Sequence, residues 1–280
     1  MAIKGLQDKV AVVTGAAGGL GRATALRLSE EGVRVVAVDL DPHRARQTAA
    51  ELPSEAIGVG ADVATEEGAE FYMEQALQAF GRVDFHHLNA GIAGSLSELV
   101  DVSVDEWDKV MAVNLRGPFL GVRAAFREYL KTGTTGSIVI TASIAGLRGS
   151  NDLLAYTTSK HGVIGLVHGA AVYGGPLGIR VNGIAPGIVP TPIFGEAGQA
   201  DMIRRAGTSP LRRPGSPEEI AGSVAFLFSD DASYITGEIL SIDGGASVQN
   251  TNRNAGGAGL WDVTVTDKDI LARHRMSSAN

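Results

Sequence analysis

The sequence predicts an α/β protein in which one doubly wound, parallel sheet of seven strands carries helices on both faces. Two observations predict this fold. Short apolar runs rich in β-branched residues alternate with longer helical patterns from about residue 9 to residue 245. The runs are nearly continuous, as in KVAVV at 9–13 and VRVVAV at 33–38, which is typical of strands buried on both faces of a parallel sheet.

The predicted elements alternate along the chain. The seven strands are Lys9–Val13, Val33–Val38, Ile57–Ala61, Val83–Leu88, Gly136–Thr141, Gly178–Ile184 and Glu238–Ile242. The helical patterns between them include Leu20–Glu31, Glu66–Phe80, Asp105–Leu130, Ala155–Tyr173 and Pro217–Phe228. Parallel strands joined through helices need right-handed crossovers, which place helices on both sides of the sheet.

The chain divides into a domain and an extension. No proline- or serine-rich linker and no internal repeat interrupts residues 1–245, so we expect one domain there and a separate C-terminal extension over residues 246–280. Asn250–Gly259 has the polar, glycine-rich composition of a flexible connector. Apolar and polar residues then alternate from Trp261 to Val265, the period of a half-buried strand. The extension is therefore predicted to dock on a neighbouring subunit and to bury Trp261. A frayed end without a role is the alternative, because disorder concentrates at chain termini.

The composition argues against several classes of protein. The charges sum to 24 − 31 = −7, whereas nucleic-acid-binding proteins usually carry a basic surface. The chain has no cysteine and no HExxH motif, so we predict no disulfide, no thiolate nucleophile and no metal site. The first residues do not resemble a secretory signal, and the longest uncharged stretch, 161–179, contains six glycines. We expect a cytoplasmic protein without a membrane span.

A glycine-rich turn, TGAAGGLG, follows the first predicted strand from Thr14 to Gly21. A pyrophosphate can lie against the amides of a helix N-terminus only where no Cβ blocks it, and Gly15, Gly19 and Gly21 meet that requirement. A tight turn between strand and helix also needs glycine for its own backbone conformation. The context favours a dinucleotide site of the Rossmann type, because a buried strand precedes the turn and a helix follows it.

An acid, Asp39, closes the second predicted strand. A carboxylate at this place can accept hydrogen bonds from an adenosine ribose, and it repels a 2′-phosphate. The next residue, Leu40, supplies no cation. Arg44 and Arg46 are expected in solvent on the following helix. The sequence therefore predicts NAD rather than NADP.

Five motifs stand in order along the chain: TGxxxGxG at 14–21, NAG at 89–91, Ser143, the pair Tyr156 and Lys160, and Pro186-Gly187. In this order and at these spacings they resemble the short-chain dehydrogenase/reductase family, in its shorter subtype. The resemblance runs from about residue 6 to residue 245. One departure is Leu88, which stands where the family often has a first asparagine before Asn89.

Tyr156 and Lys160 stand at i and i+4, so they lie side by side on one helix face. A tyrosine has an ordinary pKa of about 10, and a nearby cation lowers it. Interconversion of an alcohol and a ketone needs such an acid/base group beside a nicotinamide that exchanges the hydride. The resemblance implies that Tyr156 is the general acid/base and that Lys160 lowers its pKa and binds the nicotinamide ribose. It further implies that Ser143 orients the substrate oxygen and that Asn114 holds a water linking Lys160 to solvent.

The resemblance also implies the binding residues. Those for the cofactor are Gly15, Gly19, Leu20, Gly21, Asp39, Leu40, Asp62, Val63, Asn89, Ala90, Gly91, Tyr156, Lys160, Pro186, Gly187, Val189 and Thr191. Asp62 and Val63 would meet the adenine, whereas Val189 and Thr191 would meet the carboxamide and phosphates. The substrate pocket is expected at Ser143, Ala145, Leu147, Leu153, Tyr156, Gly187, Ile193 and Phe194. Most of these residues are apolar, which favours a ketone or secondary alcohol with a hydrocarbon body.

The expected function is that of an NAD-dependent alcohol dehydrogenase or ketoreductase. One alternative is a 3-oxoacyl-thioester reductase of fatty-acid synthesis, although such enzymes usually use NADPH. The other is a non-catalytic, dinucleotide-sensing regulator, although such proteins typically lose a catalytic residue. Arg148 is expected in solvent rather than on an acidic substrate group.

The resemblance implies a homotetramer. Gly162, Gly165 and Gly169 fall on one face of the helix that carries Tyr156. Each glycine costs about 1 kcal/mol in a helix, and the close approach of a neighbouring subunit's helix across a two-fold axis would offset that cost. Close packing within the same subunit is the alternative.

His86 and His87 are consecutive on a predicted strand. Their side chains point to opposite faces, so they cannot bind one metal ion together. We expect both to be buried, with their rings satisfied by backbone groups.

Overall fold

The computed structural model describes residues 3–149, 153–191, 193, 202–203, 205–207, 209–248 and 268. Its strands are β1 (Val10–Thr14), β2 (Arg34–Asp39), β3 (Ala56–Gly60), β4 (Phe85–Leu88), β5 (Ser137–Thr141), β6 (Arg180–Pro186) and β7 (Ile239–Ile242). They form one parallel sheet in the order β3-β2-β1-β4-β5-β6-β7. The predicted seven-stranded, doubly wound sheet is confirmed. The order reverses between β1 and β4, and such sheets bind ligands at that point, outside the carboxyl ends of the strands.

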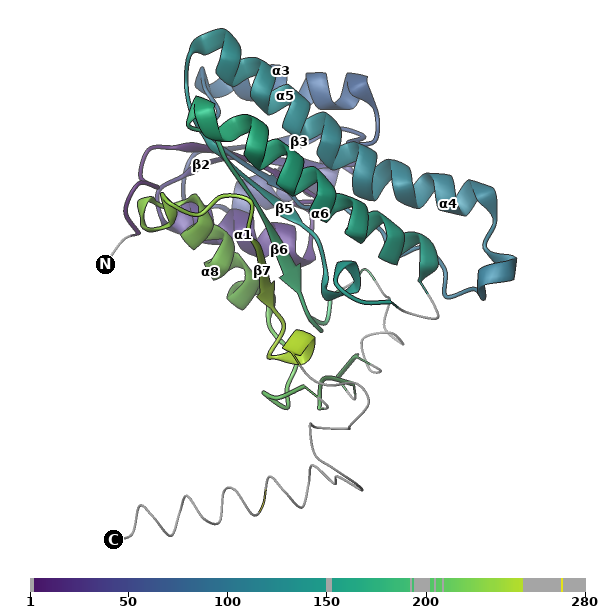
Figure 1. Ribbon diagram of the computed structural model, residues 1–280. Coiled ribbons are helices and arrows are strands. Elements are labelled where there is room, and N and C mark those ends of the chain that lie inside the picture. Colours follow the sequence, from purple (N-terminus) through teal and green to yellow (C-terminus); the bar gives the residue numbers. More distant parts are fainter. Residues whose placement is uncertain are drawn as a thin grey trace, which may run out of the picture.

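Helices cover both faces of the sheet (Figure 1). They are α1 (Gly19–Glu30), α2 (Pro42–Glu51), α3 (Glu66–Phe80), α4 (Val104–Met111), α5 (Gly117–Thr132), α6 (Leu154–Gly174) and α8 (Pro217–Phe228). Helices α1 and α8 pack against each other on one face, and α3, α5 and α6 lie on the other. This is the three-layer arrangement that right-handed crossovers produce.

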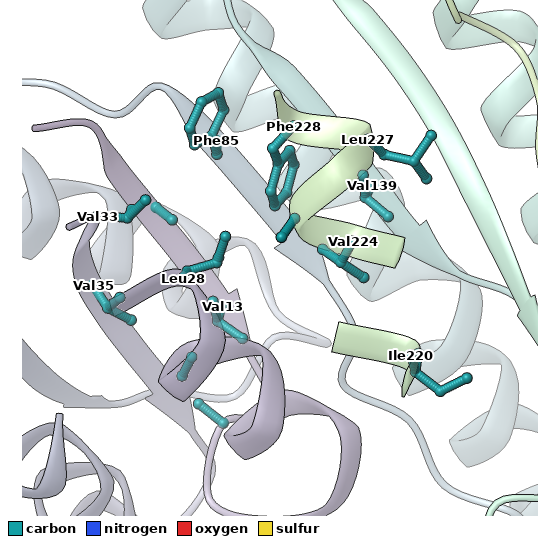
Figure 2. Close-up of a cluster of buried hydrophobic side chains, with 14 of the residues drawn as sticks. Val13, Leu28, Val33, Val35, Phe85, Val139, Ile220, Val224, Leu227 and Phe228 are labelled. Carbon is teal, nitrogen blue, oxygen red and sulfur yellow. The ribbon is translucent and has the colours of Figure 1, made fainter. Parts of the chain in front are cut away.

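The core between the sheet and α8 shows what holds the layers together (Figure 2). Val224 and Phe228 of α8 are almost completely buried, in one apolar cluster with Val13 of β1 and Val139 of β5. The ring of Phe228 stacks on that of Phe85 in β4, with the centroids 4.8 Å apart. Burying an apolar side chain of this size stabilises a fold by roughly 1.5–3 kcal/mol, so this cluster fixes the strands whose carboxyl ends form the site.

The predicted helix Asp105–Leu130 is interrupted in the structure. A π-helical turn, Ala112–Arg116, separates α4 from α5, and the amide of Gly117 donates to the carbonyl of Ala112, five residues back. Pro118 explains the interruption, because proline has no N–H to donate to the carbonyl four residues earlier. That carbonyl belongs to Asn114, which lies in the middle of the turn.

The two histidines of β4 are fully buried, as expected. The prediction that backbone groups satisfy their rings is wrong. Nε2 of His87 lies 3.0 Å from the hydroxyl of Thr141, and neither ring nitrogen of His86 has a hydrogen-bond partner among the described residues. Burial lowers the pKa of both rings to about 3, so both are neutral at physiological pH.

None of the helices in the described part of the chain is long and apolar enough to cross a membrane. The expected connector, Trp261 and the rest of the predicted extension after residue 248 lie outside the described residues, apart from Lys268. The start of the extension is described. Arg148, which was expected in solvent, is half-buried and donates a hydrogen bond to the carbonyl of Ala246.

Candidate active site

A cleft of about 1060 Å³ opens at the carboxyl ends of the strands. Its walls come from the segments that follow β1, β2, β4, β5 and β6, together with α4 and α6. These segments are far apart in the sequence and meet because parallel strands all end at the same edge of the sheet. The cleft therefore lies where the topology predicts a ligand.

The glycine-rich turn forms one end of the cleft. Gly15 and Gly19 have φ values of +67° and +51°, in the left-handed region that favours glycine. Gly18 precedes α1 as its N-cap residue, and neither a side-chain cap nor an acidic residue occupies the first turn of the helix. The amides at the start of α1 are therefore available to an anion, and the helix dipole favours one there.

Gly21 serves the turn in a different way. It does not line the cleft among the described residues; a Cβ added to it would lie 2.1 Å from the backbone oxygen of Gly15. Its hydrogen side chain allows α1 to pack directly on the turn. The glycine pattern thus combines an open surface for phosphate with close packing behind it.

Asp39 lines the same cleft as the glycine-rich turn. One carboxylate oxygen accepts the amide of Ala17 at 3.0 Å, and the other accepts the amide of Asp41 at 3.3 Å. Arg44 of α2 is exposed, as predicted, and it also contacts the glycine-rich turn. Nη2 of Arg44 donates to the carbonyl of Ala17 at 2.9 Å, and Arg44 lines the cleft beside Asp39.

Asn89 connects the ends of β1, β4 and β5. Its side-chain amide donates to the carbonyl of Thr14 at 3.1 Å, and its side-chain oxygen accepts the hydroxyl of Thr141 at 3.1 Å. The Thr14 hydroxyl accepts the amides of Asn89 and Ala90. The turn predicted to bind adenosine and ribose is thereby held rigidly against the glycine-rich turn.

The predicted catalytic side chains converge at the other end of the cleft. Ser143, Tyr156 and Lys160 all line it. Ser143 caps a short 3₁₀ turn, Ile144–Gly146, and its hydroxyl is hydrogen-bonded to Tyr156. Nζ of Lys160 lies 5.6 Å from the centre of the Tyr156 ring, and the Lys160 side chain is almost fully buried. The Ser143 hydroxyl, the Tyr156 phenol and the Lys160 ammonium therefore lie in the same part of the cleft.

The surroundings shift the pKa values of these groups. Burial raises the pKa of Tyr156, and the Ser143 hydroxyl opposes this by hydrogen bonding to the phenol. Burial lowers the pKa of Lys160 to about 8. The Lys160 ammonium also donates to the carbonyl of Thr141 at 2.7 Å, which fixes its position at the base of the cleft.

Asn114 lies behind Lys160, and its side chain is committed to protein groups. Its oxygen accepts the amide of Ile92 at 2.8 Å, and its nitrogen donates to the Ile92 carbonyl and to the Ser159 hydroxyl. A Cβ on Gly91 would lie 3.3 Å from the Asn114 oxygen and 3.6 Å from Nζ of Lys160. That Asn114 holds a water stays a prediction. Such a water could donate to the backbone carbonyl of Asn114, to which Pro118 cannot donate.

The cleft is lined by most of the predicted substrate residues and by others that the sequence did not predict. Ala145, Leu153, Gly187 and Ile193 line it as expected, whereas Leu147 does not, and Phe194 lies outside the described residues. The missed residues are Ile92, Ala93, Gly94, Ser95, Leu96, Glu106, Lys109, Val110, Thr141, Ala142, Ile144, Ile188, Met202 and Arg205. Three of them are charged, so the cleft is less apolar than predicted.

Leu153 is strained. It is the N-cap residue of α6 and has a φ of +58°, which is unfavourable for a residue with a branched side chain. The first hydrogen bond of α6 runs from the amide of Thr157 to the carbonyl of Leu153, 2.8 Å away. The strain occurs where the chain must turn to bring Tyr156 into the cleft.

The other predicted cofactor residues divide into two groups. Leu20, Pro186, Val189 and Thr191 line the cleft. Leu40, Asp62 and Val63 are not among its described lining residues; Leu40 is exposed, and Asp62 accepts the amide of Ala64 at 2.9 Å. Their contact with the adenine stays a prediction.

Comparison with known proteins identifies the family. A family model described as enoyl-(acyl carrier protein) reductase matches residues 15–247. Levodione reductase of Leifsonia aquatica is 39% identical over 253 residues, which cover 86% of this chain and 94% of that protein. Cyclohexanol dehydrogenase of an Acinetobacter species is 39% identical over 240 residues, 85% of this chain and 94% of that protein.

Solved structures agree with these relatives. The crystal structure of levodione reductase superposes with a TM-score of 0.83 at 38% identity, covering 87% of this chain and 99% of that one. NAD⁺-bound xylitol dehydrogenase gives 0.81 at 36% identity, covering 86% and 100%. A 3-ketoacyl-(acyl-carrier-protein) reductase from Brucella melitensis, complexed with NADH, gives 0.80 at 33% identity, covering 86% and 99%.

Proposed function

The chain belongs to the short-chain dehydrogenase/reductase family, and from this premise we propose that it interconverts a secondary alcohol and a ketone with NAD(H), on a largely apolar substrate. The observation that carries the proposal is the convergence of Ser143, Tyr156 and Lys160 at one end of a cleft whose other end is a glycine-rich turn beside Asp39. The relatives named above are oxidoreductases that act on alcohols or ketones.

The cleft fits a nicotinamide dinucleotide. The uncapped start of α1 and the positive φ values of Gly15 and Gly19 suit a pyrophosphate. Asp39 would accept the hydroxyls of the adenosine ribose and repel a 2′-phosphate. When bound, the nicotinamide would take or give the hydride.

Tyr156 would move the proton. In alcohol oxidation its phenolate accepts the hydroxyl proton of the substrate as the hydride leaves the carbon; in ketone reduction the phenol returns that proton to the oxygen. Ser143, already hydrogen-bonded to the phenol, would orient the substrate oxygen beside it. Lys160 would bind the nicotinamide ribose and favour the phenolate by its charge.

A 3-oxoacyl-thioester reductase is the second candidate. A neighbour of that class is complexed with NADH, so a preference for NAD does not exclude it. Lys109 and Arg205 also line the cleft and would attract an anionic substrate group. Comparing an acyl-thioester with simple cyclic and linear ketones, at equal NADH, would separate the two substrates.

Changing Tyr156→Phe tests the chemistry. We expect kcat to fall by about two to four orders of magnitude, because the proton loses its acid/base group, while NADH binding measured by fluorescence titration stays close to that of the unaltered protein. Tyr173→Phe is the matched control, since Tyr173 is exposed on the same helix and does not line the cleft. Substantial turnover by Tyr156→Phe would refute the mechanism.

A further inference from the structure

A continuous chain of hydrogen bonds crosses the carboxyl ends of β4 and β5. His87 and Asn89 stand two residues apart, so their side chains leave the same face of the sheet. The hydroxyl of Thr141 lies between them, 3.0 Å from Nε2 of His87 and 3.1 Å from the side-chain oxygen of Asn89. The side-chain amide of Asn89 then donates to the carbonyl of Thr14 at 3.1 Å. The chain therefore runs from the buried core to the start of the glycine-rich turn.

The acceptors fix the direction of every donor in this chain. The Thr14 carbonyl can only accept, so the NH₂ group of Asn89 faces it and the side-chain oxygen of Asn89 faces Thr141. That oxygen can also only accept, so the Thr141 hydroxyl donates its single proton to it. The hydroxyl must then accept from His87, which requires the tautomer with the proton on Nε2. Hydrogen bonds that point the same way along a buried chain strengthen one another.

His87 is a costly residue at this place. Its side chain is fully buried, and its other ring nitrogen, Nδ1, has no hydrogen-bond partner among the described residues. A buried polar atom without a partner destabilises a fold. An apolar side chain, like those of Phe85 and Val139 beside it on the same face, would fill the space without that cost. What His87 supplies in exchange is the hydrogen bond to Thr141.

Thr141 connects the buried ring to the cleft. Thr141 and Asn89 both line the cleft, whereas His87 is not among its described lining residues. The hydroxyl of Thr141 holds the side chain of Asn89, and the backbone carbonyl of Thr141 accepts the ammonium of Lys160 at 2.7 Å. Thr141 therefore contacts two groups that are predicted to bind the cofactor, and His87 holds Thr141 from behind.

We propose that His87 is a positioning residue for the dinucleotide, which acts through Thr141 to fix Asn89 and the turn 89–91 in the arrangement that receives the cofactor. This inference rests on the proposed binding of NAD(H). His87 touches neither cofactor nor substrate. Without its N–H, the Thr141 hydroxyl is no longer held with its proton toward Asn89, and the side chain of Asn89 loses its orientation.

Nitrogen-15 NMR of the ligand-free protein tests the direction of the chain. At pH 7 we expect the ring of His87 to be neutral, with its proton on Nε2 and none on Nδ1. The signals are assigned by their loss in His87→Gln, and Thr141→Val should shift the Nε2 signal because its acceptor is gone. A proton on Nδ1 of His87, with Nε2 bare, would overturn the inference.

NADH binding tests the positioning role, with fluorescence titration as the readout. His87→Leu removes the donor, and we expect the dissociation constant of NADH to rise by about three- to tenfold, the effect of one hydrogen bond. The kcat at saturating NADH should change little, because the contacts of Tyr156 and Ser143 are untouched. His87→Gln keeps an N–H at a similar reach and should restore most of the affinity.

A double-mutant cycle tests whether His87 acts through Thr141. Thr141→Val deletes the hydroxyl at nearly constant volume, and Thr141→Ser keeps the hydroxyl. We expect the double variant of His87→Leu and Thr141→Val to bind NADH no more weakly than the weaker single variant, because both changes break the same chain. Fully additive losses would overturn the inference.

His86→Leu is the matched control. His86 precedes His87 on β4 and is equally buried, but its ring has no hydrogen-bond partner among the described residues, and it is not among the described residues that line the cleft. Its replacement should leave the affinity for NADH unchanged. An equal loss in His86→Leu and His87→Leu would show a general effect of the core and overturn the proposal.

Two further results would also overturn it: a folded His87→Leu protein with unchanged affinity for NADH, or a loss that His87→Gln does not restore. Should His87→Leu fail to fold, the tautomer of His87 and the pair Thr141→Val and Thr141→Ser decide, because the valine must weaken NADH binding and the serine must restore it. An unaltered protein that does not bind NADH would instead refute the proposed function, so the two failures are distinguishable.

Discussion

The Lys160 ammonium is a buried charge that donates a short hydrogen bond to the carbonyl of Thr141. Burial lowers its pKa from 10.5 to about 8. The ammonium is therefore present below about pH 8 and is lost as the pH rises through that value. An unfolded chain would keep the proton up to the ordinary pKa, so this site destabilises the fold below about pH 8 and less so above it.

This titration predicts how cofactor binding depends on pH. Since a charged Lys160 would bind the nicotinamide ribose, the dissociation constant of NADH should be constant below about pH 8 and rise above it. Fluorescence titrations of NADH binding from about pH 6.5 to about pH 9.5, a range that brackets the lowered pKa of Lys160, would show the inflection. Lys160→Met should bind NADH more weakly with no inflection there; an unaltered protein with a flat profile would contradict the role.

The role of Glu106 appears only in the folded structure. Its carboxylate accepts the amide of Ser95 at 2.6 Å, and hydrogen bonds from the side chain and then the amide of Ser95 hold the pKa of Glu106 below its usual range. Gly94, with a φ of +74°, brings the loop close to Glu106. The contact fixes the loop 92–96, which lines the cleft where the substrate is predicted to bind.

Removing that contact should affect substrate more than cofactor. We expect Glu106→Ala to raise the KM for the ketone by about tenfold, the loss of one charged hydrogen bond, with little change in the KM for NADH. Asp105→Ala is the control, because Asp105 is exposed and does not line the cleft. Equal losses for both substrates would show that Glu106 supports the fold generally.

At the scale of elements, the glycine-rich turn and α1 behave as one unit. A Cβ on Gly21 would lie 2.1 Å from a backbone oxygen of the turn, and backbone cannot move aside as a flexible side chain can. The packing of the helix thereby fixes the shape of the anion site.

We predict that Gly21→Ala displaces the turn and weakens NADH binding by more than tenfold, about 1.4 kcal/mol, in titrations of the folded protein. Gly222→Ala is the matched control. It lies in α8, which packs on α1, and of the described residues its added Cβ would meet only the side chain of Arg27, at 3.6 Å. Normal NADH affinity in Gly21→Ala would mean that the turn tolerates the displacement.

At the scale of the whole molecule, α6 presents an open face. Among the described residues, a Cβ on Gly165 or Gly169 would meet nothing within 4 Å, and Val172 is 80% exposed. Gly162 differs, because its Cβ would lie 2.8 Å from the Leu115 side chain of the same subunit. Close packing within the subunit accounts for Gly162, and the approach of a neighbouring subunit stays the predicted explanation for Gly165 and Gly169.

We therefore predict a homotetramer in which α6 packs against another subunit. Sedimentation at micromolar concentration should give a tetramer for the unaltered chain. Gly165→Glu should give smaller species, because a charge would be buried between helices. Lys131→Glu on the neighbouring helix α5, where the lysine is exposed, controls for the change in charge. A monomeric unaltered protein would end this prediction.

Local patterns in the sequence predicted much of the molecule. The seven strands, the glycine-rich turn and the relation of Tyr156 to Lys160 depend on residues close together in the chain, where periodicity and backbone sterics act directly. The order of motifs along the chain was enough to indicate the family, which the relatives then confirmed. The interruption of the helix at Asn114 had a visible signal in Pro118, which the helical pattern around it obscured.

The features that only the tertiary structure decided are contacts between distant segments. Arg44 reaches the turn 27 residues before it, Glu106 holds a loop 11 residues before it, and His87 finds Thr141 rather than backbone. No pattern in the sequence specifies such contacts, because they depend on how far a flexible side chain extends across the space between packed elements. The sequence by itself therefore determined the fold and the chemical groups of the site, whereas packing decided which charges line the cleft.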